Sequence, residues 1–569
     1  MTNVTRRGLL GAAATGTLGL AACVTPTAAS GPKAYAGEVD FLHGVASGDP
    51  LTDRVILWTR VTPKSGDVPV PVKYEVFGMD GAVVTSGMLS ADAAHDFCVK
   101  ADAKGLKPAT VYTYKFTALT EAGDVTSPAG RTRTTAASGE APVKMVVISC
   151  SNWQFGQFNA YKALSQEPDI DAIVHLGDYI YEYGTDGYGG DIAKQLGREH
   201  DPITECVTLS DYRRRHAQYK TDPDLQAAHA AAPWICTWDD HESANDSYRT
   251  GAENHNPENN EGEWSDRKLA AVQAYFEWIP VREPEPGNVT TAVWRTFEFG
   301  DVASVHALET RLTGRSPSIS WFDRLAGAAT PEETVTRATA TMTEVNDPSR
   351  TMMGAEQEAW LEGELGKSVA AGKTWQVLAN QVVMARVFLP KMQEVLSPEQ
   401  IAAQDNPFVQ GMIGFSALGL PMNLDAWDGY PAARERFYDS VARTNARLVT
   451  LAGDTHTAWA NTLYDAAGVR RGVEFGCTSI TSPGSGTAVK DIPELGQMFT
   501  DANKEVEWHD PFGHGYILVT LTRDTAHAEY KKVSGILTKD WTLDSVSAWK
   551  TVTDGDGLSG LEPATEAPV

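Results

Sequence analysis

The sequence predicts a layered α/β sandwich (αββα) that is preceded by a small all-β sandwich domain. After residue 143, short apolar strands alternate with amphipathic helices, which is typical of layered α/β folds. Before residue 134, the chain shows only short alternating strands that are separated by turns. A length of 569 residues also exceeds the usual size of a domain built on one hydrophobic core, so we expect at least two domains.

Residues 1–36 read as an export signal rather than as part of the fold. Residues 5–10 (TRRGLL) form a twin-arginine motif, and the apolar run 11–22 is too short to span a membrane. Two processing sites compete: residues 20–23 (LAAC) resemble a lipobox that would lipidate Cys23, and residues 34–36 (AYA) fit signal peptidase. The lipobox directly follows the apolar run, which favours it. We therefore expect a periplasmic or extracellular protein that uses the twin-arginine export machinery, with a lipid anchor to the membrane as the favoured alternative.

An N-terminal β-sandwich is predicted over residues 38–134. Alternating runs such as 55–59 (VILWT) and 111–116 (VYTYKF) lie between turn clusters. The small and polar residues 134–142 (TTAASGEAP) come next, and they are typical of a linker.

The catalytic domain is predicted over residues 143–540, and residues 541–569 form a C-terminal tail. The apolar pattern predicts helices over residues 209–231, 267–278 and 357–365. It predicts strands over residues 300–308, 375–378, 516–521 and 527–532, the last two as an antiparallel edge. Residues 555–569 are rich in Gly, Pro and Glu, so we expect them to fray.

The charge balance limits the partners of the chain. Acidic residues outnumber basic ones 74 to 48, which gives a net charge of −26. The sequence contains no basic stripe that could bind a nucleic-acid backbone, so nucleic-acid-specific binding is not expected. A phosphate ester would meet long-range repulsion, which metal ions and a few arginines would have to overcome locally.

Residues that can hold a metal come directly after four of the apolar runs. In open α/β sheets, ligands gather just beyond the carboxyl ends of the strands, so these loops are expected to meet. The four runs, each with its adjoining candidate ligands, are 146–148 with Cys150, 172–176 with Asp178, 234–238 with 239–242 (DDHE), and 448–451 with 453–456 (GDTH). Together they predict one polynuclear metal site.

Each motif taken alone also has a plain structural interpretation. Asp178 can bridge two metals and Tyr181 can bind a hard trivalent cation, yet the same residues also suit a turn with a packed tyrosine. Asp454 and His456 lie two apart in an extended segment and so point to one side, although such turns are common without a ligand role. Burying the four ionisable residues of the DDHE run costs free energy unless their charges are neutralised, but such a run is ordinary in a solvated loop. A lone cysteine such as Cys150 is more often a small core residue than a ligand. The four motifs together favour the metal site.

The order and spacing of these elements resemble the PhoD family of alkaline phosphatases, within the calcineurin-like metallophosphoesterases. The resemblance runs from residue 41 to about residue 532, and it includes residues 44–50 (GVASGDP), 57–60 (LWTR) and 479–484 (SITSPG). The chain departs from the family at Glu309, because members usually read LDTR where this sequence has LETR. The longer acid leaves the role of that loop open.

The resemblance implies two kinds of ion, Fe³⁺ and Ca²⁺. It implies that a ferric ion is held by four residues: Cys150, Asp178, Tyr181 and His456. Asp178 would bridge to a second site that is completed by Asp240, Asn245 and Asp454. Compared with the wider superfamily, residues 150–152 (CSN) stand where Asp-x-His is usual, and Asp454 replaces a histidine. Oxygen ligands suit a hard cation, so calcium is the expected occupant of the second site.

The expected function is an exported alkaline phosphatase that hydrolyses phosphomonoesters and phosphodiesters. The metals would lower the pKa of a bound water and clamp the phosphoryl oxygens, so that hydroxide attacks phosphorus without a protein nucleophile. His241 is a candidate general acid, and Arg311 could neutralise phosphoryl charge. His175, inside an apolar run, is interpreted as a core histidine.

Two other functions remain open from the sequence. One is a specialised hydrolase on the same scaffold, such as a phospholipase D-like enzyme or a phosphotriesterase, with residues 401–430 as a substrate-selecting lid. The other is a metal-stabilised lipoprotein that binds phosphate-bearing polymers without turnover, which an intact set of ligand types disfavours. A disulfide between Cys206 and Cys236 also stays open, because spacing alone does not decide it.

Overall fold

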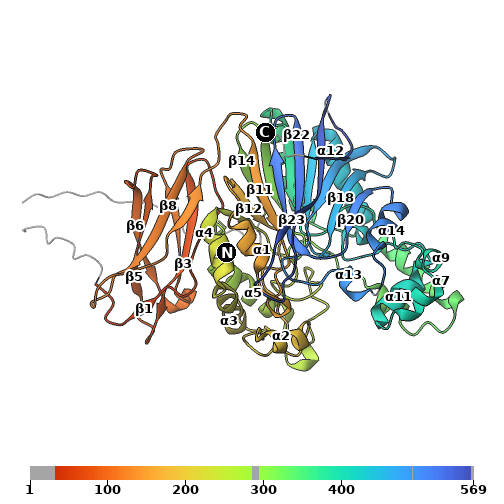
Figure 1. Ribbon diagram of the computed structural model, residues 1–569, viewed down its shortest axis with the longest axis horizontal. Helices are drawn as coiled ribbons and strands as arrows, with labels where there is room; N and C mark the ends of the chain where they lie inside the picture. Colours follow the sequence, from red (N-terminus) through yellow and green to blue (C-terminus); the bar gives the residue numbers. More distant parts are fainter. Residues whose placement is uncertain (1–32, 285–293, 490, 556, 566–569) are drawn as a thin grey trace, which may run out of the picture.

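The computed structural model describes residues 33–284, 294–489, 491–555 and 557–565. The twin-arginine motif and the lipobox with Cys23 lie outside these residues. Figure 1 shows a β-rich region at one end, a central α/β body, and a helical lobe with α7, α9 and α11 at the other end. Within the described ranges, no helix is both long enough and apolar enough to cross a membrane.

The larger sheet has eleven strands and places three of the expected ligand loops side by side. Its central strands β11, β12 and β13 are parallel, with Ile148 opposite His175 and His175 opposite Cys236. Their carboxyl ends therefore meet at one edge, as predicted for Cys150 and Asp178. In sheet order the strands are β24 (Gly557–Leu558), β23 (Leu543–Asp554), β22 (Thr525–Val533), β21 (His514–Leu521), β11 (Val143–Ile148), β12 (Ala172–His175), β13 (Trp234–Cys236), β2 (Val45–Gly48), β3 (Arg54–Arg60) and β7 (Cys98–Lys104), with β25 (Glu562–Pro563) paired to β23.

The second sheet has seven strands, and its strand β17 leads into the fourth ligand loop. Strands β15, β16, β17 and β19 run parallel to one another. In sheet order the strands are β14 (Arg295–Phe299), β15 (Ala303–Ala307), β16 (Trp375–Ala379), β17 (Leu448–Ala452), β19 (Arg470–Gly476), β18 (Ala458–Tyr464) and β20 (Val506–Asp510).

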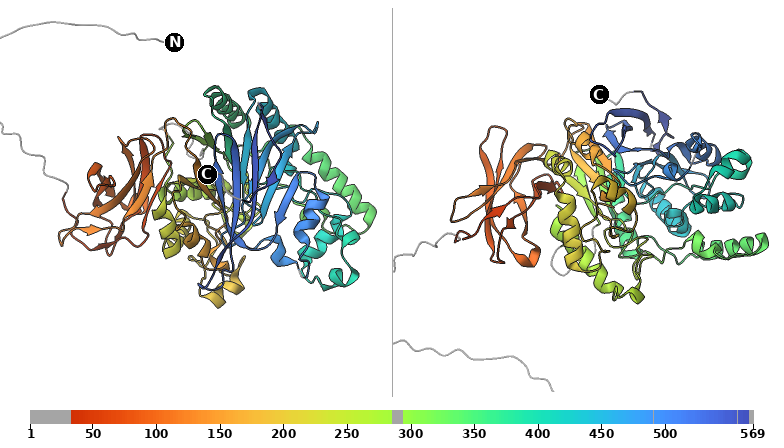
Figure 2. Two further views of the ribbon diagram at one scale, coloured as in Figure 1. Left: turned by 45° about the horizontal axis from the view of Figure 1, so that its top comes forward. Right: turned by 60° about the horizontal axis from the view of Figure 1, so that its bottom comes forward.

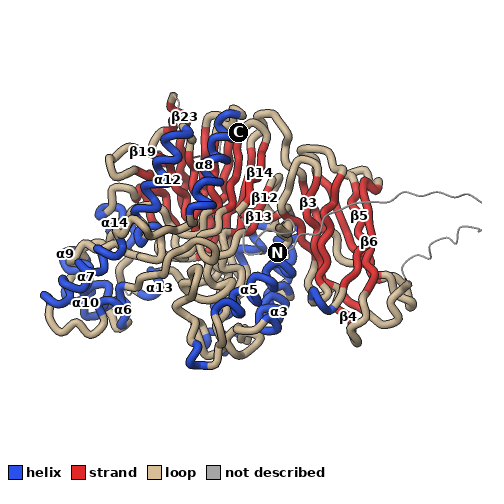
Figure 3. The backbone as a smooth tube through the Cα atoms, turned by 180° about the vertical axis from the view of Figure 1, so that it is seen from behind, coloured by secondary structure: helices blue, strands red, loops and turns tan. Residues whose placement is uncertain are grey.

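One buried cluster joins the two sheets, since Val147 and Val174 of the first sheet share it with Val305, Val377 and Val449 of the second. Two further cores pack helices on the sheets, and Figure 3 shows α8 and α12 lying over the strands. The expected combination of mixed sheets, helices and an N-terminal β region is confirmed. The packed helices are α1 (Asn159–Leu164), α3 (Leu209–Lys220), α4 (Pro223–Ala231), α5 (Trp264–Trp278), α8 (Ala355–Ala370), α12 (Pro431–Thr444) and α14 (Leu495–Ala502), and the short helices α2 (Gly190–Leu196) and α13 (Ser485–Ala488) lie in loops.

The N-terminal region shares strands with the catalytic body, which the sequence did not indicate. Strands β2, β3 and β7 extend the eleven-stranded sheet, where Gly48 pairs with Trp234. Gly48 is required there, because a Cβ would lie 2.2 Å from the carbonyl oxygen of Pro280. The opposite layer is a separate sheet of β5 (Val70–Phe77), β6 (Val83–Ala91), β8 (Val111–Ala118), β9 (Val125–Thr126) and β10 (Gly130–Arg133), and a small ribbon joins β1 (Val39–Asp40) to β4 (Thr62–Pro63).

The helix predicted over residues 209–231 is two helices, which corrects the sequence interpretation. Pro223 lacks the N–H that would continue α3, and it stands at the first position of α4. The carboxylate of Asp222 caps α4 by accepting hydrogen bonds from the backbone N–H groups of Asp224 (2.9 Å) and Leu225 (3.3 Å). The other two predicted helices lie within α5 and α8, which are longer.

The C-terminal residues also differ from expectation. Residues 557–565 do not fray but form β24 and β25, which pair antiparallel with β23, whereas residues 566–569 of the predicted frayed end lie outside the described residues. The long strand β23 offers unpaired backbone groups at the edge of the sheet, and these short strands cover part of that edge. All five described cysteines are free, so Cys206 and Cys236 do not form the disulfide that the sequence left open.

The helical lobe contains residues 401–424 of the predicted lid 401–430, and the last residues of that stretch pack against the body. The small core of the lobe includes Trp321, Val345 and Leu424. Figure 2 shows α7 projecting from the body at this end. The role of residues 401–430 as a lid stays a prediction. The lobe is built from α6 (Trp321–Leu325), α7 (Pro331–Val345), α9 (Met392–Val395), α10 (Pro398–Ala403) and α11 (Pro407–Ser416).

Candidate metal centre

The four ligand loops converge at the ends of both sheets. Cys150, Asp178 and Asp240 follow strands of the larger sheet, whereas Asp454 and His456 follow β17 of the second sheet. The sequence predicted that the loops would meet, but it did not indicate that they come from two sheets.

Backbone strain marks four of the expected ligands. Cys150, Asp178, Asp454 and His456 have φ angles of 61°, 55°, 66° and 61°, in the left-handed region that residues other than glycine seldom adopt. Such conformations persist where the surrounding structure over-determines them, and they concentrate at functional sites. Here each follows a strand end and redirects the chain within the converging loops.

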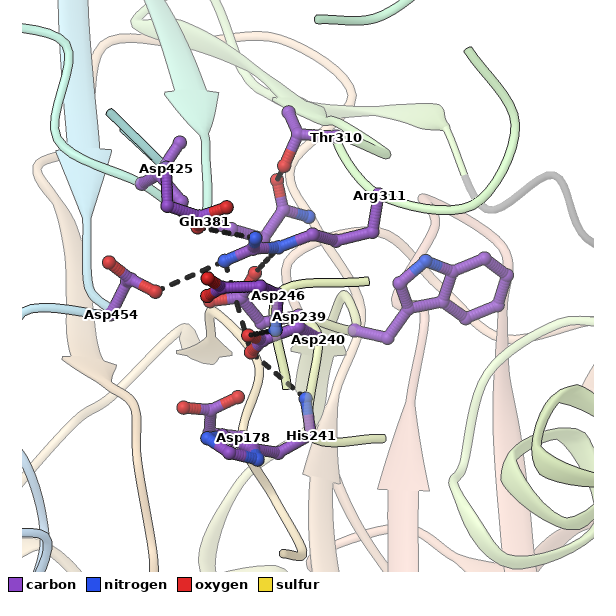
Figure 4. A network of polar contacts seen from close by, with 12 residues as sticks. Asp178, Asp239, Asp240, His241, Asp246, Thr310, Arg311, Gln381, Asp425 and Asp454 are labelled. Atoms are coloured by element: carbon purple, nitrogen blue, oxygen red, sulfur yellow. Dashed lines mark hydrogen bonds and ion pairs between the residues drawn. The ribbon is translucent and has the colours of Figure 1, made fainter. Parts of the chain in front are cut away.

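The structure brings possible metal donors together in three groups that share members. In each group the donor atoms lie within 4.8 Å of one another. Asp178 belongs to the first two groups and Asp240 to the last two, as a bridging carboxylate would. Figure 4 shows Asp178, Asp240 and Asp454 around the same centre. The groups are Cys150–Asp178–His456, Asp178–Asp240–His241 and Asp239–Asp240–Asp454.

Asp178 has one satisfied and one unsatisfied oxygen. Its Oδ2 accepts a hydrogen bond from the Tyr181 hydroxyl at 3.1 Å. Its Oδ1 is buried and has no hydrogen-bond partner among the described residues. Burial raises the pKa of Asp178 well above its ordinary value. A buried oxygen without a donor is costly, and a cation would satisfy it.

His456 presents the lone pair of Nε2 to the same centre. Its Nδ1 lies 3.1 Å from the carbonyl oxygen of Pro483, which can only accept, so Nδ1 carries the proton. Its Nε2 lies 3.1 Å from the Tyr181 hydroxyl. Burial lowers the pKa of His456 to about 4, which keeps the ring neutral. A neutral imidazole fixed through its other nitrogen is a typical metal ligand.

Cys150 and Tyr181 complete this part of the centre. Burial raises the pKa of the Cys150 thiol and of the Tyr181 phenol well above their ordinary values. Both groups therefore stay protonated unless a cation holds their anionic forms, which couples metal binding to proton release. Ser482 donates to the Tyr181 hydroxyl oxygen at 2.6 Å and fixes its position.

Arg311 lies inside the acidic half of the centre, fully buried. Its guanidinium donates to Asp239, to Asp425 at 2.5 Å and to Asp454 at 3.1 Å. Burial alone would lower the pKa of Arg311, but Asp239, Asp240 and the other carboxylates raise it well above the ordinary value. The structure thus brings the predicted Arg311 into the site, where its donors are engaged by carboxylates.

His241 shares one of the donor groups with Asp178 and Asp240. Its Nδ1 lies 2.7 Å from Oε2 of Glu182, and its ring contacts the Tyr181 ring in a tilted arrangement, with 4.2 Å between the ring centroids. Burial lowers the pKa of His241, but the charges of Glu182, Asp240 and Asp178 outweigh it and raise the pKa well above the ordinary value. The ring is therefore held in one orientation by a buried carboxylate.

Asn245 is tied to the same carboxylate through its backbone. Its N–H donates to Oε1 of Glu182 at 2.8 Å, and its side-chain amide donates to Glu253 at 3.1 Å. The role of Asn245 as a metal ligand stays a prediction.

Sequence reasoning did not predict that three buried glutamates hold the loops, although it had named two of them, Glu242 as a possible ligand and Glu309 as a departure from the family. Glu182 fixes His241, and Glu242 accepts the backbone N–H groups of Asp178 (3.0 Å) and Asp239 (2.7 Å). Glu309 accepts from Trp238 Nε1 and from the backbone of Arg311, both at 2.8 Å. Each of these acids lies within a predicted motif or directly beside one, and that was the available signal.

His175 is a core residue, as expected. Its Nδ1 accepts the N–H of Gly177 at 3.2 Å, and its Nε2 lies 3.1 Å from the Tyr161 hydroxyl. The ring is stacked on Trp234 and belongs to none of the three donor groups found among the described residues.

This architecture defines the class of the protein: an α/β protein with a candidate metal centre built from polar loops at strand ends. Comparison with known proteins narrows the class. The family described as PhoD-like phosphatase matches residues 145–530, and the N-terminal domain of PhoD-like phosphatases matches residues 26–136. The chain is 34% identical over 548 residues to alkaline phosphatase D of Bacillus subtilis (strain 168), which covers 92% of this chain and 83% of that protein.

A solved structure agrees with the sequence comparison. The structure described as that of PhoD matches with a TM-score of 0.73 and 30% identity, and the match covers 93% of each chain. The chain therefore belongs to the PhoD-like phosphatase family and is a phosphoric ester hydrolase.

Proposed function

We propose that the protein is an exported, metal-dependent alkaline phosphatase that hydrolyses phosphomonoesters and phosphodiesters. The observation that carries the proposal is the unpartnered Oδ1 of Asp178, a buried oxygen on a residue shared by two donor groups. A carboxylate in this position fits a bridge between two cations. The centre lies at the ends of two facing sheets with helices packed against them, which we interpret as the αββα sandwich.

The donor chemistry fits two different ions. A thiol, a phenol and an imidazole beside Asp178 suit Fe³⁺, with Cys150, Tyr181 and His456 as its other ligands. The oxygen-rich half, with Asp240, Asn245 and Asp454, suits Ca²⁺. When bound, such ions supply Lewis acidity and a nucleophilic hydroxide at neutral pH.

Two side chains of the protein would assist hydrolysis: one would supply a proton to the leaving group, and the other would offset negative charge on the phosphoryl group. His241 is placed to hold a proton for the leaving alkoxide, because Glu182 fixes its ring and the surrounding carboxylates favour its protonated form. Arg311 keeps its positive charge beside Asp239 and Asp454, where it would offset the charge of phosphoryl oxygens that approach the centre.

Metal analysis of natively exported protein tests this proposal. We expect iron and calcium by mass spectrometry, and hydrolysis of 4-nitrophenyl phosphate that a chelator abolishes and calcium restores. Asp178→Asn should lose both metal and activity, whereas Asp544→Asn, which alters an exposed carboxylate on β23, should retain both. Zinc as the sole metal, or activity that survives chelation, would contradict the ligand assignment.

Membership of a phosphatase family argues against the alternative of a lipoprotein that only binds phosphate-bearing polymers. A specialised hydrolase remains a second candidate. The helical lobe ends next to Asp425, which contacts both Arg311 and Arg315 at 2.5 Å. The lobe therefore reaches the centre and could select among esters. Comparing kcat/KM for a monoester, a diester and a triester would separate the two candidates, because a specialised enzyme prefers one of them strongly.

Tyr35 supports processing at Cys23 rather than after Ala36. Tyr35 is 6% exposed and packs in the core of the N-terminal region. Its N–H donates to the carbonyl of Leu119 at 2.9 Å, and its hydroxyl donates to that of Ser65 at 2.5 Å. Cleavage after Ala36 would remove these contacts, so we infer a lipid-modified Cys23. Intact-mass analysis of the mature protein tests this, and a mature chain that begins at Gly37 would overturn it.

A further inference from the structure

An exposed tyrosine stands at the rim of the metal centre. Tyr188 is 37% exposed, whereas Tyr181 is fully buried. The Tyr188 ring lies 6.4 Å from the ring of Tyr181, 5.9 Å from that of Tyr183 and 4.7 Å from that of Phe155. Tyr181 contacts both Asp178 and His456, so Tyr188 reaches these donor residues through a single intervening ring, that of Tyr181.

The loop that carries Tyr188 is tightly held. Buried Gln154 donates to the Tyr188 carbonyl at 3.0 Å, and the N–H of Thr185 donates to the carbonyl of Ile203 at 2.8 Å. Gly189 has a φ of 95°, and a Cβ there would lie 2.8 Å from the Phe155 ring. The chain therefore fixes where the Tyr188 ring stands, which lowers the entropic cost of using it as a contact surface.

The phenol of Tyr188 stays neutral and makes no side-chain hydrogen bond within the described part of the chain. Burial raises its pKa. Within the acidic centre, the ring thus offers an uncharged flat surface to a neutral group.

We propose that Tyr188, supported by Phe155 and Tyr183, forms a stacking subsite for phosphate esters whose alcohol carries a planar ring. The inference rests on the proposed function, because it assigns the leaving-group side of the same centre. A ring attached to the ester oxygen would stack on the exposed part of Tyr188 while the phosphoryl group lies among the donor groups. Edge-to-face and offset contacts between such rings add affinity beyond simple burial.

Two matched esters test the subsite. Benzyl phosphate and cyclohexylmethyl phosphate have similar size and similar alkoxide leaving groups, but only the first carries an aromatic ring. We expect the wild-type enzyme to favour benzyl phosphate by about 3- to 10-fold in kcat/KM, the size of an aromatic contact. Tyr188→Leu should abolish this preference, and Tyr188→Phe should retain it, because only the second keeps the ring.

Phe388→Ala, which removes a comparably exposed ring (39%) elsewhere in the chain, should retain the preference. Equal rates on both esters in the wild type, or a preference that survives in Tyr188→Leu, would overturn the subsite. The wild-type comparison needs no variant, so the proposal stays testable even if a substitution disturbs the loop. If the wild type hydrolyses neither these esters nor 4-nitrophenyl phosphate, the proposed function itself fails, which is a different outcome.

Discussion

Oε2 of Glu182 lies 2.7 Å from Nδ1 of His241, and both side chains are buried beside Asp240. The same carboxylate accepts hydrogen bonds from the backbone of Asn245 and from the side chain of Asn254, both at 2.8 Å. Glu182 therefore ties the orientation of the candidate general acid to the loop that follows it.

Glu182→Gln should lower kcat by about 10- to 100-fold, the usual cost of losing a buried partner that orients a functional group. The amide keeps the volume but removes the charge that favours protonated His241. The loss should be larger for alkyl phosphates than for 4-nitrophenyl phosphate, because a poor leaving group depends more on the proton donor. Steady-state kinetics with both esters measures this difference.

A double mutant checks whether the two residues act as one unit. Adding Glu182→Gln to His241→Ala should cost little more than His241→Ala alone, since Glu182 acts through that ring. Additive losses would show that Glu182 has a separate role.

Asp178→Asn should lower activity by more than about 100-fold, beyond the losses typical of residues that only orient a ligand. The amide keeps one oxygen but removes the charge that a bridging position requires. Iron and calcium content should fall together, because the residue belongs to two donor groups. Loss of one metal with retention of the other would indicate that Asp178 binds one ion without bridging.

Much of the centre could be predicted from the sequence because its ligands follow apolar strands directly. Cys150, Asp178 and Asp454 stand close behind strand ends, so their positions follow from the sheet. Asp425 could not be found in this way. It lies after the helical lobe, 114 residues from Arg311 in the chain, and only the folded lobe returns it to the site.

The shared sheet was also hidden from the sequence, for a related physical reason. The pairing of Gly48 with Trp234 joins segments that are far apart in the chain, and neither segment carries a pattern that specifies its neighbour. The helix boundary at Pro223, by contrast, could have been predicted from the sequence, because proline cannot continue a helix, but the single helix predicted over residues 209–231 overlooked it.

Glu309→Gln should destabilise the loop that carries Arg311. Glu309 accepts the backbone N–H groups of Arg311 and Thr313 at 2.8 Å through its two oxygens, so the amide must turn an N–H₂ group towards a donor. An unsatisfied buried donor costs about 1–3 kcal/mol, which urea unfolding can measure. Glu298→Gln, on β14 and only partly buried, serves as the control and should stay near wild type.

Activity should fall in Glu309→Gln even where the protein is folded, because Arg311 is displaced from Asp239 and Asp454. A variant with lowered stability but unchanged kcat/KM would show that the loop has a structural role only.

Lys220→Met should change how stability depends on pH. Lys220 is 1% exposed, lies 3.1 Å from Nε2 of His229, and contacts the ring of Trp58 at 4.4 Å. Burial lowers its pKa to about 7, whereas a lysine in the unfolded chain titrates near about 10.4. Between these values the unfolded state binds more protons, so this group makes the folded state more stable as pH rises, by up to about 1.4 kcal/mol per pH unit.

Methionine removes this contribution while filling the same space. The difference in unfolding free energy, variant minus wild type, should therefore be most favourable to the variant near about pH 7 and should decline towards about pH 9.5. Other buried groups titrate in this range, and taking the difference cancels them. Chemical denaturation at both pH values measures it, with Lys104→Met as the control because that side chain is 61% exposed. A difference that does not vary with pH would mean that Lys220 keeps an ordinary pKa in the folded protein.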